Sequence, residues 1–225
     1  MAFGNWQGIG HQNRLDKYKS SVSMVTQHYR QLVDNLITAR KIAYKVNPIS
    51  CTTIIQELKL KSYIFLAHAA IEQYVEALVL DVSRQALDQY VQSQKVSRAL
   101  IGLISSGLLA RVEESGLNKK VKKEPFENIG LFATTAYGRF RSLVGDNNGI
   151  KIENQTKLFL PIGVDPATED PVTMAALDSF GGKRGAIAHE FKIAKIHSLS
   201  EIDSDLETIR SGLPTLDQSC TNALA

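Results

Sequence analysis

Residues 180–190 (FGGKRGAIAHE) contain an arginine and a histidine at a spacing that suits phosphate chemistry. Arginine presents a planar fork of N–H donors that stabilises charge on phosphate oxygens. Histidine, with an unperturbed pKa near ~6.5, moves protons at neutral pH. Arg184 and His189 are therefore the candidate catalytic residues.

The two glycines before Lys183 predict that one helix ends at residue 180 and another begins at residue 183. The free N–H groups of a first helical turn bind anions, so this start predicts a phosphate site that includes Lys183. A cation at the N-terminal end of a helix opposes the helix dipole and destabilises the helix by roughly 0.3–1 kcal/mol. The presence of two cations there therefore favours a functional reason for them.

Arg184 and His189 do not share a face of a regular helix, because five residues rotate the helix by about 140° and advance it by roughly 7.5 Å. Three arrangements remain open. The arginine reaches back towards the histidine, the helix starts irregularly at Gly185, or two copies of the site meet across a dimer.

The remaining sequence contains no P-loop, HExxH, GxSxG or dinucleotide-binding motif. Cys51 and Cys220 have no metal-binding spacing and suit a reducing cytosol, so we expect no metal, no cofactor and no disulfide. No signal peptide is visible at the N-terminus, and the apolar run at 64–80 is interrupted by polar residues. We therefore expect a cytoplasmic protein without a membrane partner.

Hydrophobic periodicity predicts an all-α bundle in a single domain over residues 1–225, with an N-terminal helical extension to about residue 48 and a core over about 50–212. An a/d seam predicts a long first helix at 13–46, pairing within the chain or with a second subunit. The segment 145–167 is predicted to be irregular, with a short strand at 158–160. The other predicted helices span 51–93, 95–115, 125–144, 168–180, 183–195 and 200–211, the last capped by Ser198 or Ser200.

Composition is that of an ordinary globular protein, with 225 residues, 44% hydrophobic and 22% charged. The net charge of +3 is unevenly distributed, since residues 1–61 carry nine Lys/Arg against three Asp/Glu. This asymmetry permits contact with a polyanion such as RNA, although a solvated surface explains most such runs. The candidate RNA-steering residues are Lys119, Lys120, Lys122, Lys123, Arg139 and Arg141.

The stretch Arg-Gly-Ala-Ile-Ala-His at 184–189 resembles the Arg-x(4–6)-His motif of HEPN domains. Residues 66–78 (LAHAAIEQYVEAL) are similar to the second helix of the RiboL-PSP-HEPN-like group, where a glutamate lies among alanines. The resemblance covers about residues 50–200. It implies a helical dimer and a metal-independent endoribonuclease, often a toxin or abortive-infection effector, with Arg184 and His189 at the motif positions.

The resemblance also has one departure, because many active members carry Asn, Asp or His directly after the arginine and this chain carries Gly185. Glu72 and Glu190 are candidates to orient the histidine, with a surface or salt-bridge role equally open. The predicted function is an RNA-cleaving homodimer whose product carries a 2′,3′-cyclic phosphate. An antitoxin or regulatory protein is a further candidate partner. The alternatives are a non-catalytic binding module, favoured by the long seam and Gly185, and nucleotide binding without cleavage.

Overall fold

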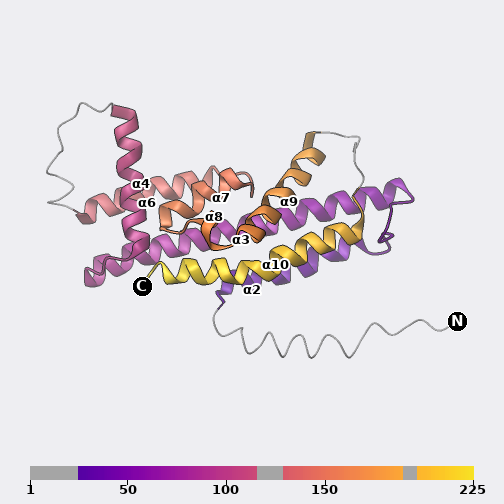
Figure 1. Ribbon diagram of the computed structural model, residues 1–225, viewed down its shortest axis with the longest axis horizontal. Helices are drawn as coiled ribbons and strands as arrows, with labels where there is room; N and C mark the ends of the chain where they lie inside the picture. Colours follow the sequence, from indigo (N-terminus) through magenta and orange to yellow (C-terminus); the bar gives the residue numbers. More distant parts are fainter. Residues whose placement is uncertain (1–24, 116–128, 190–196) are drawn as a thin grey trace.

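The computed structural model describes residues 25–115, 129–189 and 197–225. Every regular element in these ranges is helical, which confirms the all-α fold (Figure 1). In chain order the elements are α2 (Gln27–Arg40), the 3₁₀ turn η2 (Lys41–Ala43), α3 (Ile54–Ser93), α4 (Arg98–Ser115), α6 (Ile129–Gly145), α7 (Ile152–Phe159), η3 (Leu160–Ile162), α8 (Pro166–Glu169), α9 (Pro171–His189) and α10 (Leu199–Asn222).

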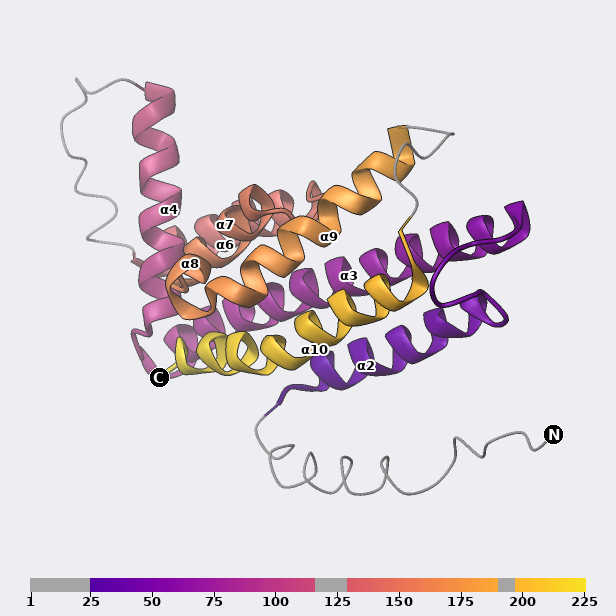
Figure 2. The ribbon, with the colours of Figure 1, turned by 45° about the vertical axis from the view of Figure 1, so that its right-hand side comes forward.

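Helix α3 is the longest element, and the others are arranged along it. It spans 40 residues between its N-cap Thr53, whose hydroxyl accepts from the Gln56 N–H, and its C-cap Gln94, which is in the left-handed region. Helices α2 and α10 run beside it, and α6 and α9 contact its remaining length (Figure 2). By length and hydropathy α3 could cross a membrane, but half of its most apolar window is buried inside the bundle. This burial is what the central helix of a bundle requires.

Helix α2 forms the described part of the predicted N-terminal seam. Its seam residues pack into the same core as α3, so of the two pairings left open by the sequence this part of the seam takes the one within the chain. The buried seam residues are Tyr29, Leu32, Leu36, Ala39, Ala43 and Val46. The helix ends earlier than predicted, in the η2 turn and a positive φ of 62° at Lys45. Seam positions before residue 25 lie outside the described residues.

The segment 145–167 differs from its prediction, since the strand expected at 158–160 is the end of α7 and the start of η3. A short apolar run cannot be assigned to strand or helix from periodicity alone. In the structure Leu158 and Phe159 are both fully buried, and η3 passes close to α4. A Cβ at Gly102 would lie 2.7 Å from the backbone nitrogen of Gly163, so these two glycines permit the crossing.

Helix α10 begins as predicted, with the Ser198 hydroxyl accepting from the Glu201 N–H, but it continues well beyond residue 211. It passes through Pro214 and ends at Asn222. The extension buries Leu213, Leu216 and Cys220, and this apolar burial offsets the backbone hydrogen bond that proline removes.

A buried carboxylate joins α10 to α2 and α3. Asp217 is fully buried and accepts hydrogen bonds from the Thr26 backbone N–H at 2.6 Å, the Thr26 hydroxyl at 2.7 Å and the Tyr74 hydroxyl at 3.1 Å. Burial, followed by the nearby Asp217 charge, raises the pKa of Tyr74 well above its ordinary value, so the tyrosine remains a donor. Three helices therefore depend on one carboxylate.

Replacing Asp217 should be strongly destabilising. In Asp217→Ala the hydroxyls of Thr26 and Tyr74 lose their buried acceptor, and we expect the free energy of unfolding to fall by about 2–4 kcal/mol. Urea denaturation followed by circular dichroism measures this change. The matched control is Asp88→Ala, which breaks only an exposed pair with Arg84 and should cost less than about 1 kcal/mol. Equal losses in the two variants would contradict the anchoring role of Asp217.

Candidate functional site

The predicted motif lies on α9, which is continuous from Pro171 to His189. The helix boundary expected at the two glycines is therefore wrong, and no first helical turn is available at Lys183 to bind an anion. The physical reason is packing: a Cβ at Gly181 would lie 3.0 Å from Lys151 Cγ and 3.3 Å from Ile150 Cγ1. Glycine here permits a close approach inside a helix, which offsets its lower helical propensity of about 1 kcal/mol.

Arg184 projects from α9 towards α3. Its guanidinium carbon lies 5.5 Å from the centre of the Phe65 ring, a cation–π distance. The side chain is half-buried, and within the described residues it makes neither a hydrogen bond nor an ion pair. Its donors therefore remain available to a phosphate, and the Phe65 contact orients the side chain.

Two ionisable residues on the same face of α3 complete this region. His68 and Glu72 follow Phe65 at helical spacing, and His68 Nδ1 lies 3.7 Å from Glu72 Oε2, too far for a hydrogen bond. The other carboxylate oxygen, Glu72 Oε1, is buried without a hydrogen-bond partner in the described part of the chain. An unpaired acceptor and an unpaired arginine thus belong to the same cluster of side chains.

The pKa values in this cluster reflect burial first and Arg184 second. Burial, followed by the positive charge of Arg184, lowers the pKa of His68 to about 4, so the imidazole is neutral at physiological pH. Burial and then Glu76 raise the pKa of Glu72, while Arg184 opposes that rise. Both residues therefore sense the charge of Arg184, which shows that the three groups are electrostatically linked.

His189 is the last residue of α9. Because the helix is continuous through Gly185, the interpretation of an irregular start at that residue is excluded. On a regular helix the two motif positions are about 140° apart, so Arg184 and His189 occupy different sides of α9. A Cβ at Gly185 would meet no atom within 4 Å, so packing does not impose the glycine there.

Lys183 has a different role from the predicted phosphate contact. Its ammonium forms ion pairs with Glu201, at 2.7 Å, and with Asp205, both on α10. Hydrogen bonding from Lys183 is the main cause that lowers the pKa of Glu201 to about 2, with His197 also contributing through a 3.0 Å contact. Lys183 therefore anchors α9 to α10, and its charge is already compensated.

The other predicted residues are not assembled with Arg184 by the described structure. Arg139 and Arg141 lie exposed on α6. Lys119, Lys120, Lys122, Lys123 and Glu190 lie outside the described residues.

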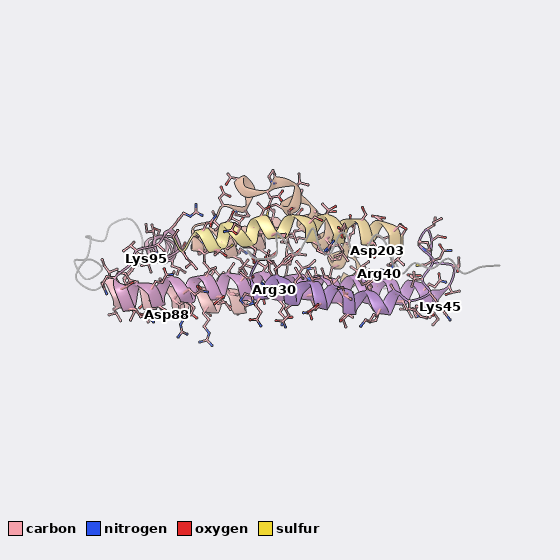
Figure 3. All side chains as sticks on the ribbon, turned by 90° about the horizontal axis from the view of Figure 1, so that it is seen from below. Arg30, Arg40, Lys45, Asp88, Lys95 and Asp203 are labelled. Atoms are coloured by element: carbon pink, nitrogen blue, oxygen red, sulfur yellow. The ribbon has the colours of Figure 1, made fainter. Side chains whose placement is uncertain are left out.

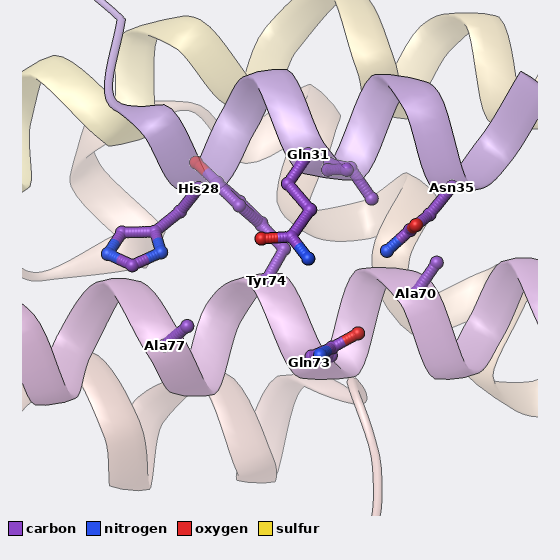
Figure 4. A pocket seen from close by; sticks show the side chains of 8 residues that line it. His28, Gln31, Asn35, Ala70, Gln73, Tyr74 and Ala77 are labelled. Carbon is purple, nitrogen blue, oxygen red and sulfur yellow. The ribbon is translucent and has the colours of Figure 1, made fainter.

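A separate small pocket lies between α2 and α3 and is lined by three side-chain amides, His28, Tyr74 and smaller apolar side chains (Figure 4). His28 Nε2 lies 3.2 Å from Asp81 Oδ2. The pocket uses the face of α3 that carries Ala70, Gln73 and Ala77, whereas Arg184 packs on the face of Phe65. It is therefore not part of the motif region.

Sequence reasoning identified Arg184 and Glu72 as candidates but not Phe65 or His68. The spacing of Phe65, His68 and Glu72 at i, i+3 and i+7 was the available signal, because it places all three on one helix face. What the spacing could not show was that α9 would bring an arginine onto that face.

The comparison with protein families can now be set beside this geometry. The family model described as RiboL-PSP-HEPN matches residues 27–222, which include all helices from α2 to α10. The chain belongs to the RiboL-PSP-HEPN family. No curated protein and no solved structure matches it. The match extends beyond the 50–200 segment of the sequence resemblance and includes Glu72, Arg184 and His189.

Burial of His68 predicts a loss of stability in acid. Its pKa is about 4 in the folded chain and 6.5 as an ordinary histidine, so between these pH values the unfolded chain binds a proton that the folded chain does not. The free energy of unfolding should therefore fall from pH 6.5 towards pH 4, with His68 contributing on the order of 2–3 kcal/mol.

Denaturant unfolding of the wild type and His68→Gln across this range measures the effect. The free energy of unfolding of the variant should depend less steeply on pH than that of the wild type, and the difference in slope should correspond to at most one bound proton. Glu72, whose raised pKa acts in the opposite direction, is present in both proteins. Identical slopes would show that His68 is not buried in its neutral form.

Proposed function

We propose that this RiboL-PSP-HEPN protein is a metal-independent endoribonuclease, cytoplasmic, that acts as a toxin or defence effector. The observation that carries the proposal is Arg184, a half-buried arginine without an acidic partner in the described chain, five residues before His189 in a matched HEPN sequence. A cation kept unpaired beside a buried histidine and a half-buried glutamate is expensive unless it binds an anion.

In the proposed reaction the 2′-hydroxyl of a ribose attacks the adjacent phosphate and the 5′-oxygen leaves. Arg184 stabilises the charge that develops on the non-bridging oxygens, and His189 transfers a proton. Glu72 serves as a positioning residue, because its unpaired Oε1 offers an acceptor that can hold Arg184 once the guanidinium leaves the Phe65 ring. The products carry a 2′,3′-cyclic phosphate and a 5′-hydroxyl.

The separation of Arg184 and His189 around α9 supports a site shared between two copies of the chain. With one copy supplying the arginine and the other the histidine, the two positions need not share a helix face. Arg139 and Arg141, exposed on α6, and the lysines at 119–123 are the proposed RNA-steering residues.

Cleavage should require both motif residues. Purified Arg184→Ala and His189→Ala should each cleave total RNA at least about 100-fold more slowly than the wild type, because each loses one transition-state contribution. Cleavage should persist in EDTA, and induced expression of the wild type alone should arrest growth. The matched controls are Arg84→Ala and His28→Gln, which change residues remote from α9 and should leave the rate unchanged. Wild-type cleavage by His189→Ala would contradict the proposed chemistry.

Mixing the two inactive variants tests whether the site is shared. A dimer that combines Arg184→Ala with His189→Ala holds one complete pair if the groups come from different copies and none if they come from the same copy. Random pairing should then restore about a quarter of the wild-type rate. No recovery in a mixture shown to contain mixed dimers would place both groups within one chain.

Gly185 favours a second candidate function, a binding module that retains RNA without cutting it. The position is open, yet it lacks the polar side chain found after the arginine in many active members. A binding module would shift a labelled RNA without producing fragments. It would lose that binding in Arg184→Ala and keep it in His189→Ala.

A further inference from the structure

The turn that joins α2 to α3 exposes a group of large apolar side chains. Six of them form what we call the hairpin-tip patch: Ile42, Tyr44, Ile49, Ile54, Ile55 and Leu58. Ile49 is 81% exposed, Ile54 72% and Tyr44 66%. Single exposed apolar residues are common, but several gathered at one turn are typical of an interaction surface.

The turn that carries the patch is ordered by its own hydrogen bonds. The Asn47 side chain accepts from the backbone N–H groups of Ile49 and Ser50, and Gln56 Oε1 accepts from the N–H of Thr52. Lys59 Nζ donates to the Tyr44 carbonyl oxygen across the turn. The apolar side chains are thus held outward on a fixed backbone, which lowers the entropy that binding would cost.

The backbone conformation at Lys45 is a second feature of this turn that lowers the stability of the fold. Its φ of 62° is in the left-handed region, which costs a non-glycine residue roughly 1 kcal/mol. This conformation brings the Lys45 ammonium to 5.2 Å from the centre of the Tyr44 ring. It also places a cation beside Tyr44, which is the aromatic side chain of the patch.

The charges around the patch are positive and uncompensated. Lys41, Lys45 and Lys59 form no ion pair with the described acidic residues. Two acids of this region already have basic partners, since Glu57 pairs with Lys61 at 2.7 Å and Asp203 pairs with Arg40 at 2.8 Å. Figure 3 shows Lys45 at the end of the bundle, beyond the Arg40–Asp203 pair. An acidic surface would complement this end of the molecule.

These observations select among the surfaces that could cover the patch. A second copy docking through the same patch would place lysines against lysines. A nucleic acid would satisfy the lysines but leave five aliphatic side chains in water. A bilayer would have to bury Asn47, Ser50 and Thr52 beside the isoleucines, at the cost of desolvating polar groups. A protein segment with both acidic and apolar side chains satisfies all of them.

We propose that the hairpin-tip patch is a docking site for an acidic amphipathic segment of a partner protein, such as a helix with leucines on one face and glutamates beside them. The apolar face of that segment covers Ile49, Ile54 and their neighbours, and its carboxylates pair with Lys41, Lys45 and Lys59. The proposal concerns a surface separate from Arg184 and does not depend on ribonuclease activity.

The test uses the full chain and a fluorescein-labelled helical peptide in which glutamates flank a leucine face, followed by fluorescence anisotropy. The wild type should bind this peptide, and binding should weaken in roughly 0.5 M salt because the lysine contacts are screened. Ile49→Ser/Ile54→Ser and Lys41→Glu/Lys45→Glu should each weaken binding at least about ten-fold. A peptide of the same composition in scrambled order should bind more weakly than the helical one.

The matched control is Val91→Ser/Val96→Ser, which changes two residues, 61% and 58% exposed, in the last turn of α3 and just after it, and should leave the affinity unchanged. Circular dichroism checks that every variant is folded. The proposal is wrong if the helical peptide binds no better than the scrambled one, or equally well to Ile49→Ser/Ile54→Ser. It is also wrong if phosphatidylserine vesicles or polyuridine RNA displace the peptide and lose their own binding in the same variants.

Discussion

The need to bury α3 governs the architecture of this protein. A 40-residue helix with apolar residues on most of its sides is stable in water only when other helices cover those sides. Helices α2 and α10 cover one part of its surface, and α6 and α9 contact others. The path of α9, and therefore the position of the motif arginine, follows from this requirement.

The contrast between two neighbouring cations shows how the fold separates structure from chemistry. Lys183 is neutralised by two carboxylates of α10 and holds α9 in place. Arg184, the next residue, faces α3 and meets an aromatic ring, a neutral histidine and a carboxyl with a raised pKa. One cation stabilises the fold through ion pairs, while the other has no acidic partner among the described residues. The ion pairs of Lys183 hold α9 against α10, and α9 is the helix that carries the unpaired Arg184.

Carboxylates elsewhere in the molecule show the same contrast between a fully paired group and a group with an unpaired atom. Asp217 is buried with three donors and can therefore serve as a structural anchor. Glu72 is half-buried, and its Oε1 atom is buried without a partner among the described residues. Such an unpaired oxygen contributes no stability and is typical of a position where a ligand or a moving side chain supplies the missing partner. The hairpin tip presents the reverse case, with apolar groups left in water and cations left without acids.

The sequence alone determined the helical class, the long central helix and the family motif, because these depend on periodicity and local residue types. It identified Arg184, His189 and Glu72 as candidates, and the family match includes all three. Where local signals were ambiguous, the tertiary structure decided. The glycines at 181–182 predicted a helix boundary, but in the structure they lie inside one continuous helix, where Gly181 packs against Ile150 and Lys151. The partner of Lys183 and the placement of Arg184 over Phe65 join residues distant in sequence, so only the assembled bundle could specify them.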